Sequence, residues 1–551
     1  MTEASESDDQ KNRADSSSLR MREMENGDAS DRASGGKQKS TTCRLIMCIV
    51  GAVMGSLQFG YNVGVINAPE SLIKKFMNET TYKRDGSSLS EDAIRNLWAL
   101  TASIFSVGGC FGGFLAGWCA TKLGRKGGSL SNIVLGVVAS VLMFASRRAG
   151  SFEMIIVGRI LIGFHAGIYT GISPMYLSEI STPNIRGAVG VLHQLAIVTG
   201  ILSAQILGFP DLLGTEDSWD ILLGLAIVPC LMQGLILPFC PESPRYLLIT
   251  KGDEKKCREA LVILRGTRNI EDEVDEIKQE ASSCGDQLSI IDLFRIRSLR
   301  WPLLIGVVMQ LSQQLSGVNG VFFYSTNLFK EAGLSDRQAT YTTSAVGATM
   351  VIMTLVSIPL IDRLGRRSLH LTGIGGMAVF SILVTIALAL RERVNGFDIA
   401  STVFVLIYMV FFAIGPGSIP WLIVAELFSH DARPAAMSIS VLVNWLSSFT
   451  VGFVFPNLQE SLQDYTFLPF TGLLVLFFLF TFFFVPETKG KTFEEVSALW
   501  RTKDTETPGS SPSINKLNEA LDQKGPYGST NGAYSPSSEF SDDDKKIIAR
   551  F

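Results

Sequence analysis

The sequence Lys122-Leu-Gly-Arg-Lys126 recurs farther along the chain as Arg363-Leu-Gly-Arg-Arg367, an offset of 241 residues from 122 to 363. A second motif, Pro241-Glu-Ser-Pro-Arg245, returns as Pro486-Glu-Thr-Lys-Gly490 after 245 residues, from 241 to 486. Because two different motifs repeat at almost the same distance, they indicate an internal duplication. The chain is therefore expected to consist of two related halves.

A pair of opposite charges repeats in the same way. Glu179 and Arg186 stand seven residues apart, and Glu426 and Arg433 repeat this spacing 247 residues later, from 179 to 426. All three repeated motifs fall in segments between or after apolar runs, and these segments lie on the same predicted face of a membrane. Their charges therefore become candidates for a function at that face.

Apolar runs long enough to cross a bilayer separate these motifs. The 551 residues are 47% hydrophobic and only 18% charged, with a mean hydropathy of +0.28, which is too apolar for a soluble chain of this length. Each run approaches the roughly 20 residues that a crossing needs. Only one of the twelve contains a formal charge, Arg159. The runs are 45–66, 97–121, 128–146, 154–178, 187–210, 221–240, 302–324, 338–361, 368–390, 399–425, 434–459 and 465–486.

Six runs fall in each half, so the two halves keep the same orientation in the membrane. The sequence predicts an all-α membrane protein with twelve transmembrane helices in two parallel six-helix halves, plus a charged, helix-favouring cytosolic linker domain. The expected parts are a disordered cytosolic N-terminus at 1–42, helix bundles at 43–240 and 301–490, the intracellular linker domain at 241–300, and a largely disordered cytosolic tail at 491–551.

Positive charge favours a cytoplasmic position for both termini. In that orientation the inner segments hold 36 of the 48 Lys and Arg residues. The sequon Asn78-Glu-Thr80 then falls in the first outer loop, where Asn78 is a candidate for glycosylation. We therefore expect a multi-pass protein with both ends in the cytosol.

Several function classes are disfavoured. A net charge of −4 gives no clustered positive field for nucleic acid. No cysteine or histidine spacing suggests a metal or a cofactor. His165, His193 and His370 stand singly in apolar runs without a nucleophile and base arrangement, so we do not expect an enzyme. The expected partners are the lipid bilayer and a small solute.

One helical face of the seventh run carries several amides. Gln310, Gln313 and Gln314 share that face, because steps of three and four residues return to one side of a helix. On a straight helix Asn319 would point away from Gln310. The stretch Ser316-Gly-Val-Asn-Gly320 is where we expect the helix to break and bring Asn319 round.

Polar and aromatic side chains gather in three further runs. The tenth reads Gly415-Pro-Gly-Ser-Ile-Pro-Trp421, which its prolines keep from forming a regular helix. In the eleventh, Asn444 and Ser448 are one turn apart with Trp445 beside them, and Gln194 lies in the fifth. Amides donate and accept hydrogen bonds, and indoles pack on apolar ring faces, so the set suits an uncharged hydroxylated solute such as a sugar. The alternative is that the amides only join helix to helix.

With these residues in place, the chain resembles the sugar porter branch of the major facilitator superfamily, and within it the class I facilitative glucose transporters of animals. The likeness extends from about residue 43 to 500. It implies the major facilitator fold and facilitative, uniport transport of hexose, chiefly D-glucose, across the plasma membrane by alternating access. The motifs that carry it are Gly60-Tyr-Asn-Val-Gly64, the paired Gly-Arg loops, Pro241 to Arg245, Gln310 to Gly317, Gly415 to Trp421 and Pro486 to Gly490.

The resemblance also implies which side chains meet the sugar. Gln310-Leu-Ser312 resembles the motif associated with accepting glucose, and galactose is a second candidate substrate. Met350 and Ser448 stand where the family has asparagine, and Ala413 where it has glutamate, which bears on hexose selectivity. The expected substrate-binding residues are Gln194, Gln310, Gln313, Gln314, Asn319, Trp421, Asn444, Trp445 and Ser448.

Charged residues of the repeated motifs are expected to form a gate, as the family's cytoplasmic clamp is thought to do. We expect them to bridge the halves while the inner side is closed and to part when it opens. The alternative is that they only fix the topology. The residues are Glu179, Arg186, Glu242, Arg245, Asp362, Arg366, Glu426 and Arg433.

Two rival functions remain open. Proton-linked sugar porters carry an aspartate in the first span, next to an arginine in the fourth. Here Asn62, which cannot titrate, takes the place of that aspartate, while Arg159 is present. The sequence therefore favours uniport over proton-coupled symport. A sugar sensor that signals through its polar tails without net transport is a further alternative.

Overall fold

The computed structural model describes residues 42–283, 288–391, 393–394, 396–429, 432–489, 491 and 495–496. All regular elements within these ranges are helices. The predictions for both chain ends and for the polar tail fall outside the described residues, apart from Thr42 and three residues beyond 490.

The first half of the chain forms one group of helices, which we call the first group. Its long members are separated by short turns, and α3 is an additional helix between the first two. The elements are α2 (Cys43–Gly64), α3 (Glu70–Asp85), α4 (Glu91–Ala149), α5 (Glu153–Ile180), α6 (Pro183–Leu207), α7 (Trp219–Gly224), α8 (Ile227–Ile236) and the 3-10 turn η1 (Leu237–Phe239).

The second half repeats this arrangement, and we call it the second group. Shorter helices connect the groups: η2 (Tyr246–Thr250), α9 (Glu254–Arg265), α10 (Glu271–Ser283) and α11 (Ile290–Arg295). The second group consists of α12 (Arg297–Gln314), α13 (Val318–Glu331), α14 (Asp336–Leu364), α15 (Arg366–Leu390), α16 (Phe397–Ile414), α17 (Ile419–Leu427), α18 (Arg433–Leu462), the turn η3 (Gln463–Tyr465) and α19 (Leu468–Phe484).

The twelve predicted crossings are confirmed within the described ranges. Nine helical stretches are long and apolar enough to cross a membrane. One of them, α4, contains two crossings, because its backbone leaves helical geometry at Gly124. The broken pair α12–α13 and the 17-residue α19 supply the remaining two.

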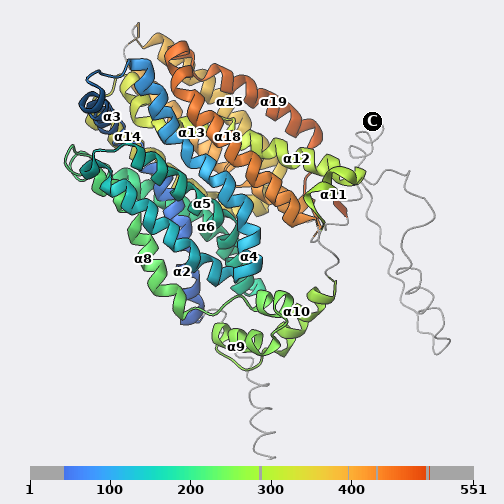
Figure 1. The fold of residues 1–551 in the computed structure, drawn as a ribbon. Helices are drawn as coiled ribbons and strands as arrows, with labels where there is room; N and C mark the ends of the chain where they lie inside the picture. Colours follow the sequence, from blue (N-terminus) through green and yellow to red (C-terminus); the bar gives the residue numbers. More distant parts are fainter. Residues whose placement is uncertain are drawn as a thin grey trace, which may run out of the picture. The chain divides into compact units, whose positions relative to one another are not determined.

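The two groups meet along two pairs of helices, α4 with α18 and α6 with α14. Figure 1 shows α9 and α10 below the long helices and α3 at the opposite end. We call these two ends the linker face and the α3 face. Thr42 and Arg265 hold α9 to the first group, through hydrogen bonds to the Leu264 oxygen (2.7 Å) and the Ile180 oxygen (2.8 Å).

Both predicted helix breaks are confirmed. Helix α12 ends at Gln314 and α13 begins at Val318, while α16 ends at Ile414 and α17 begins at Ile419. Helix α3 was not predicted, because its stretch has many charges and was interpreted as an outer loop. Its charges are compatible with a helix because most of them face outward, with Ile73 and Met77 buried beneath them.

The first break requires a glycine, which gives a testable prediction. Gly317 has φ of +92°, and a Cβ built there would lie 2.8 Å from the ring of Phe470. Gly317→Ala should lower the free energy of unfolding by more than about 1 kcal/mol, because a side chain costs roughly that much in left-handed geometry and also meets the ring. Thermal unfolding of the purified protein in detergent measures this. Gly472→Ala is the control, since a Cβ on α19 meets open space; equal midpoints for the two variants would contradict the prediction.

Candidate functional site

Asn444 on α18 lies at the centre of a network of amides beside the break between α12 and α13. Its Nδ2 donates to Oε1 of Gln310 (2.8 Å) and of Gln313 (2.6 Å). Its Oδ1 accepts from Nε2 of Gln314 at 3.0 Å. Three of the amides predicted on one face of the seventh run therefore converge on a fourth from the eleventh.

The network extends to both broken helices. Gln313 Nε2 donates to the carbonyl oxygens of Pro416 and Gly417, each at 2.8 Å. These carbonyls have no partner within a helix, because the helix is interrupted between α16 and α17. The second break therefore supplies acceptors to a side chain beside the first break. The arrangement holds the two breaks next to each other.

Asn319 joins the network from α13. Its Nδ2 donates to Gln314 Oε1 and to Ser448 Oγ, the latter at 2.9 Å. The break thus turns Asn319 toward the amides, as predicted. Ser448 Oγ is also 2.9 Å from Ser106 Oγ on α4, so the network reaches the first group through a residue that the sequence did not reveal.

One donor in this network has no acceptor. Nε2 of Gln310 is buried without a hydrogen-bond partner in the part of the chain that the structure describes, although its Oε1 is bonded to Asn444. A buried amide N–H without a partner costs free energy, roughly 1–3 kcal/mol. A hydroxyl oxygen of a bound solute would relieve that cost.

The remaining predicted sugar contacts lie around the network. Trp445 is buried and packs on Phe59 and Phe105, with ring centroids 5.4 and 5.6 Å apart, so it joins α18 to the first group. Trp421 is partly buried on α17 against the main core. Gln194 is partly buried on α6, outside the network.

Arg159 is enclosed within the first group. Its guanidinium donates to the backbone oxygens of Asn62 (2.6 Å) and Ala102 (2.9 Å) and lies 4.6 Å from the centroid of the Phe105 ring. The contact with Asn62 is therefore made by the backbone, while the side-chain Nδ2 of Asn62 donates to the Gln58 oxygen at 2.9 Å. Neutral groups surround the cation at this point.

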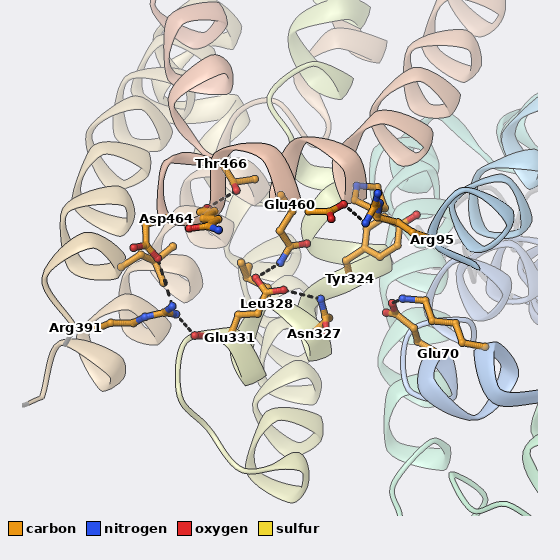
Figure 2. A pocket seen from close by; sticks show the side chains of 15 residues that line it. Glu70, Arg95, Tyr324, Asn327, Leu328, Glu331, Arg391, Glu460, Asp464 and Thr466 are labelled. Carbon is orange, nitrogen blue, oxygen red and sulfur yellow. Dashed lines mark hydrogen bonds and ion pairs between the residues drawn. The ribbon is translucent and has the colours of Figure 1, made fainter. Parts of the chain in front are cut away.

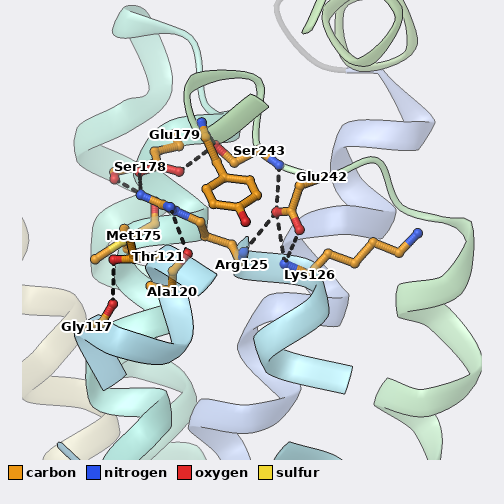
Figure 3. Close-up of polar contacts among 11 residues, drawn as sticks. Gly117, Ala120, Thr121, Arg125, Lys126, Met175, Ser178, Glu179, Glu242 and Ser243 are labelled. Carbon is orange, nitrogen blue, oxygen red and sulfur yellow. Dashed lines mark hydrogen bonds and ion pairs between the residues drawn. The ribbon is translucent and has the colours of Figure 1, made fainter. Parts of the chain in front are cut away.

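The first Gly-Arg motif forms a closed set of polar contacts at the linker face. Gly124 turns the chain at φ +83°, and Glu242 Oε1 accepts the backbone N–H groups of Arg125 (2.9 Å) and Lys126 (3.0 Å) that this turn presents. Figure 3 shows the side chain of Arg125 reaching Glu179, at 2.7 Å, while Ser243 Oγ donates to the same carboxylate.

The second Gly-Arg motif repeats these contacts almost atom for atom. Glu487 accepts the backbone N–H groups of Arg366 (2.8 Å) and Arg367 (3.1 Å), beside Gly365 at φ +89°. Arg366 pairs with Glu426 at 3.0 Å, and Thr488 Oγ1 donates to Glu426 at 2.5 Å. The duplication in the sequence is thus a duplication of geometry.

The predicted gate residues are distributed unevenly in this network. Glu179, Glu242, Arg366 and Glu426 belong to it, whereas the side chains of Arg186 and Asp362 lie outside the described residues. Arg433 donates to the Phe428 oxygen at 3.1 Å within the second group. Arg245 also interacts with a neighbouring group.

Two charged side chains of the repeated contacts were missed, those of Arg125 and Glu487. Both lie inside motifs quoted from the sequence, and Glu487 is the repeat of Glu242. Matching the duplicated motifs position by position would have found them. The pairs Arg125–Glu179 and Arg366–Glu426 each stay within one group rather than bridging the two.

Polar contacts toward the α3 face do cross between the groups. Asn67 Nδ2 donates to Ser325 Oγ (2.7 Å) and to the Phe322 oxygen (2.8 Å), and Arg337 pairs with Asp211 at 2.7 Å. None of these was singled out from the sequence, because Asn67 follows directly after an apolar run and the charges are ordinary loop residues by composition. Together they join the groups at this face.

Arg95 on α4 makes further contacts of this kind. It pairs with Glu460 on α18 and donates through Nε to Asn457 Oδ1 at 3.0 Å. Figure 2 shows this pair beside a cavity of about 510 Å³ at the α3 face, which Glu70 and Tyr324 also line. Burial raises the pKa of the Glu70 carboxyl, against the opposing effect of the Lys74 ammonium 2.6 Å away.

The chain is similar to known sugar transporters. The family model described as "Sugar (and other) transporter" matches residues 47–500. The chain is 47% identical over 464 residues to the solute carrier family 2 facilitated glucose transporter member 3 of Canis lupus familiaris, covering 84% of this chain and 93% of that protein. The corresponding Homo sapiens protein is 46% identical with the same coverage.

Solved structures share the fold. The inward-open conformation of the xylose transporter XylE from E. coli matches with a TM-score of 0.69 at 26% identity, covering 83% of this chain and all of that one. The major facilitator superfamily proton:xylose symporter XylE bound to 6-bromo-6-deoxy-D-glucose matches with a TM-score of 0.68 at 26% identity, covering 83% and 99%. This protein is therefore an all-α membrane protein with the major facilitator fold, and it belongs to the sugar transporter family.

Proposed function

We propose that this protein is a facilitative uniporter of hexose, with D-glucose as its main substrate, and that it works by alternating access. The observation that carries the proposal is the amide network around Asn444, which offers donors and acceptors from two broken helices and contains no charge. The resemblance to transporters named for glucose supports the choice of substrate. Transport of this kind needs neither a catalytic group nor a cofactor, so the protein is not an enzyme.

The predicted sugar contacts are the proposed binding residues, with Ser106 added from the first group. The sugar would exchange hydrogen bonds with Gln310, Gln313 and Asn444, and the nearby Trp421 would cover an apolar ring face. Each hydrogen bond contributes roughly 1 kcal/mol net, which gives weak binding and allows release. Galactose, which differs from glucose in the orientation of one hydroxyl, is a second proposed substrate.

Neutral surroundings of Arg159 favour uniport over proton coupling. XylE is described as a proton symporter, so coupling is a real alternative within this fold. A proton carrier needs a group that titrates, and Asn62 supplies only an amide beside the arginine. In a purely sensory role the contacts that join the two groups at the α3 face would have no need to open.

We propose that the molecule is closed at the α3 face in this structure. Arg95, Asn67 and Asp211 join the groups there, whereas Arg125–Glu179 and Arg366–Glu426 at the linker face remain within their own groups. The linker-face charges would exchange partners across the groups when that side closes. We further propose that the linker face is cytoplasmic, that the protein resides in the plasma membrane, and that the α3 face, with Asn78 as a glycosylation site, is extracellular.

The first experiment tests transport itself. Purified protein reconstituted in lipid vesicles preloaded with unlabelled D-glucose should accumulate labelled glucose by counterflow, and galactose should compete. In separate vesicles without internal sugar, so that glucose enters as a net flux, a pH-sensitive dye inside should report no change. Absence of counterflow would reject the transporter, and glucose-driven acidification would reject uniport.

A second prediction concerns the centre of the network. Asn444→Ala removes partners from three glutamines, so glucose affinity should fall by about 10- to 100-fold, corresponding to about 1–3 kcal/mol. Ser447→Ala is the matched control, because Ser447 is also buried but bonds only to the Val443 oxygen of its own helix, at 2.7 Å. Binding is measured by isothermal titration on variants with unchanged thermal midpoints. Equal glucose affinities in the two variants would contradict the proposal that Asn444 belongs to the binding site.

A third prediction concerns closure at the α3 face. Arg95→Gln loses its ion pair to Glu460, and because Glu460 is half exposed the loss is about 1 kcal/mol. The population open at this face should rise severalfold, so KM for glucose should fall at the α3 face and rise at the linker face. KM is measured from each side in oriented vesicles. Arg84→Gln is the control, since Arg84 pairs with Glu153 within the first group. The same KM values in both variants would count against a role of the Arg95–Glu460 pair in closing the α3 face.

A further inference from the structure

Helix α11 is a short element fixed to the linker-face end of the second group (Figure 1). Leu293 is fully buried and packs in the core formed by α12, α17 and α18. Ser289 closes the N-terminal end of α11 with a capping box to Asp292, and Arg300 Nε donates to the Phe294 oxygen at 2.7 Å at the other end. Both ends are therefore held, and the helix has a defined outward side.

That outward side is apolar. Ile291 is 61% exposed, Phe294 55% and Ile290 37%. Phe294 is four residues from Ile290 and three from Ile291, so these three side chains share one side of the helix, and the buried Leu293 lies opposite Ile291. Large apolar side chains gathered on one side of a capped helix normally face another apolar phase.

Positive charge accompanies this apolar face. Arg295, Arg297 and Arg300 fall within six residues and are all exposed. The only acidic residue of α11, Asp292, accepts the N–H and O–H of Ser289, at 3.0 and 2.8 Å. The local balance is therefore strongly cationic.

The position of α11 along the chain fixes its depth. Only Ile296 separates it from α12, whose apolar crossing begins at Pro302, and Leu304 in that crossing is 42% exposed. The apolar side of α11 thus continues a membrane-facing helix at its end. A helix there lies at the boundary between headgroups and acyl chains.

We propose that α11 is an interfacial helix that lies in the plane of the bilayer and binds anionic phospholipid headgroups. Ile291 and Phe294 enter the acyl boundary, and Arg295 and Arg297 contact the negatively charged headgroups. A free anion would contact the arginines but not the apolar side chains, and an apolar protein surface would contact the apolar side chains but not the arginines. An anionic lipid surface contacts both. The inference goes beyond sugar transport and does not depend on it.

Titration of lipid into the full-length protein in detergent tests whether α11 binds anionic lipid, with the thermal unfolding midpoint as the readout. Phosphatidylserine should raise the midpoint more than phosphatidylcholine does. Each arginine near an anionic surface is worth about a fivefold change in affinity. Arg295→Gln/Arg297→Gln should therefore shift the half-maximal phosphatidylserine concentration upward by about tenfold or more, and added salt should weaken the wild-type response.

Two further variants separate the contributions. Ile291→Ser/Phe294→Ser should weaken the response to both lipids, because it removes the apolar anchor and keeps the charges. Arg268→Gln removes an exposed arginine between α9 and α10 and should change nothing. The proposal is overturned if the double arginine variant responds like Arg268→Gln, or if inorganic phosphate reproduces the stabilisation that phosphatidylserine gives the wild type.

Discussion

Inside a lipid bilayer a polar group has no water to bond with, so it must find its partner within the protein. This constraint explains the interior of the molecule. Asn444 bonds to three glutamines, and Gln313 donates to the carbonyls that the α16–α17 break leaves open. Breaking a helix is costly in hydrocarbon unless the freed carbonyls find donors, and here the side chain of Gln313 donates to two of them. In the proposed function these same groups bind the sugar, whose hydroxyls would replace contacts within the protein.

The duplicated motifs apply the same rule at the membrane surface. In each half a glycine turns the chain, a glutamate accepts the N–H groups that the turn presents, and an arginine pairs with a second glutamate one helix away. The repetition shows that this is a structural unit inherited by both halves. Any role in gating is built on a unit that already stabilises each half separately.

Sequence reasoning was strong where the signal is local and weak where it depends on contacts between distant helices. The twelve crossings follow from the long apolar runs, the duplication from the repeated motifs, and both breaks from the positions of glycine and proline. The convergence of Gln310, Gln313 and Gln314 followed from helical spacing. In contrast, Ser106 and Asn67 are ordinary polar residues beside apolar runs, and only the packing of one group on the other gives them partners. Arg95 was not singled out from the sequence for the same reason.

Glu242 and Glu487 determine how freely the two groups can separate. Because each carboxylate is bonded to backbone amides of its own group, drawing the groups apart at the linker face strands neither of these charges without a partner. The open state consequently carries little electrostatic penalty relative to a closed one. A carrier driven only by concentration must cross between its two forms on thermal energy, and the carboxylates of Glu242 and Glu487 can keep their backbone partners throughout that crossing.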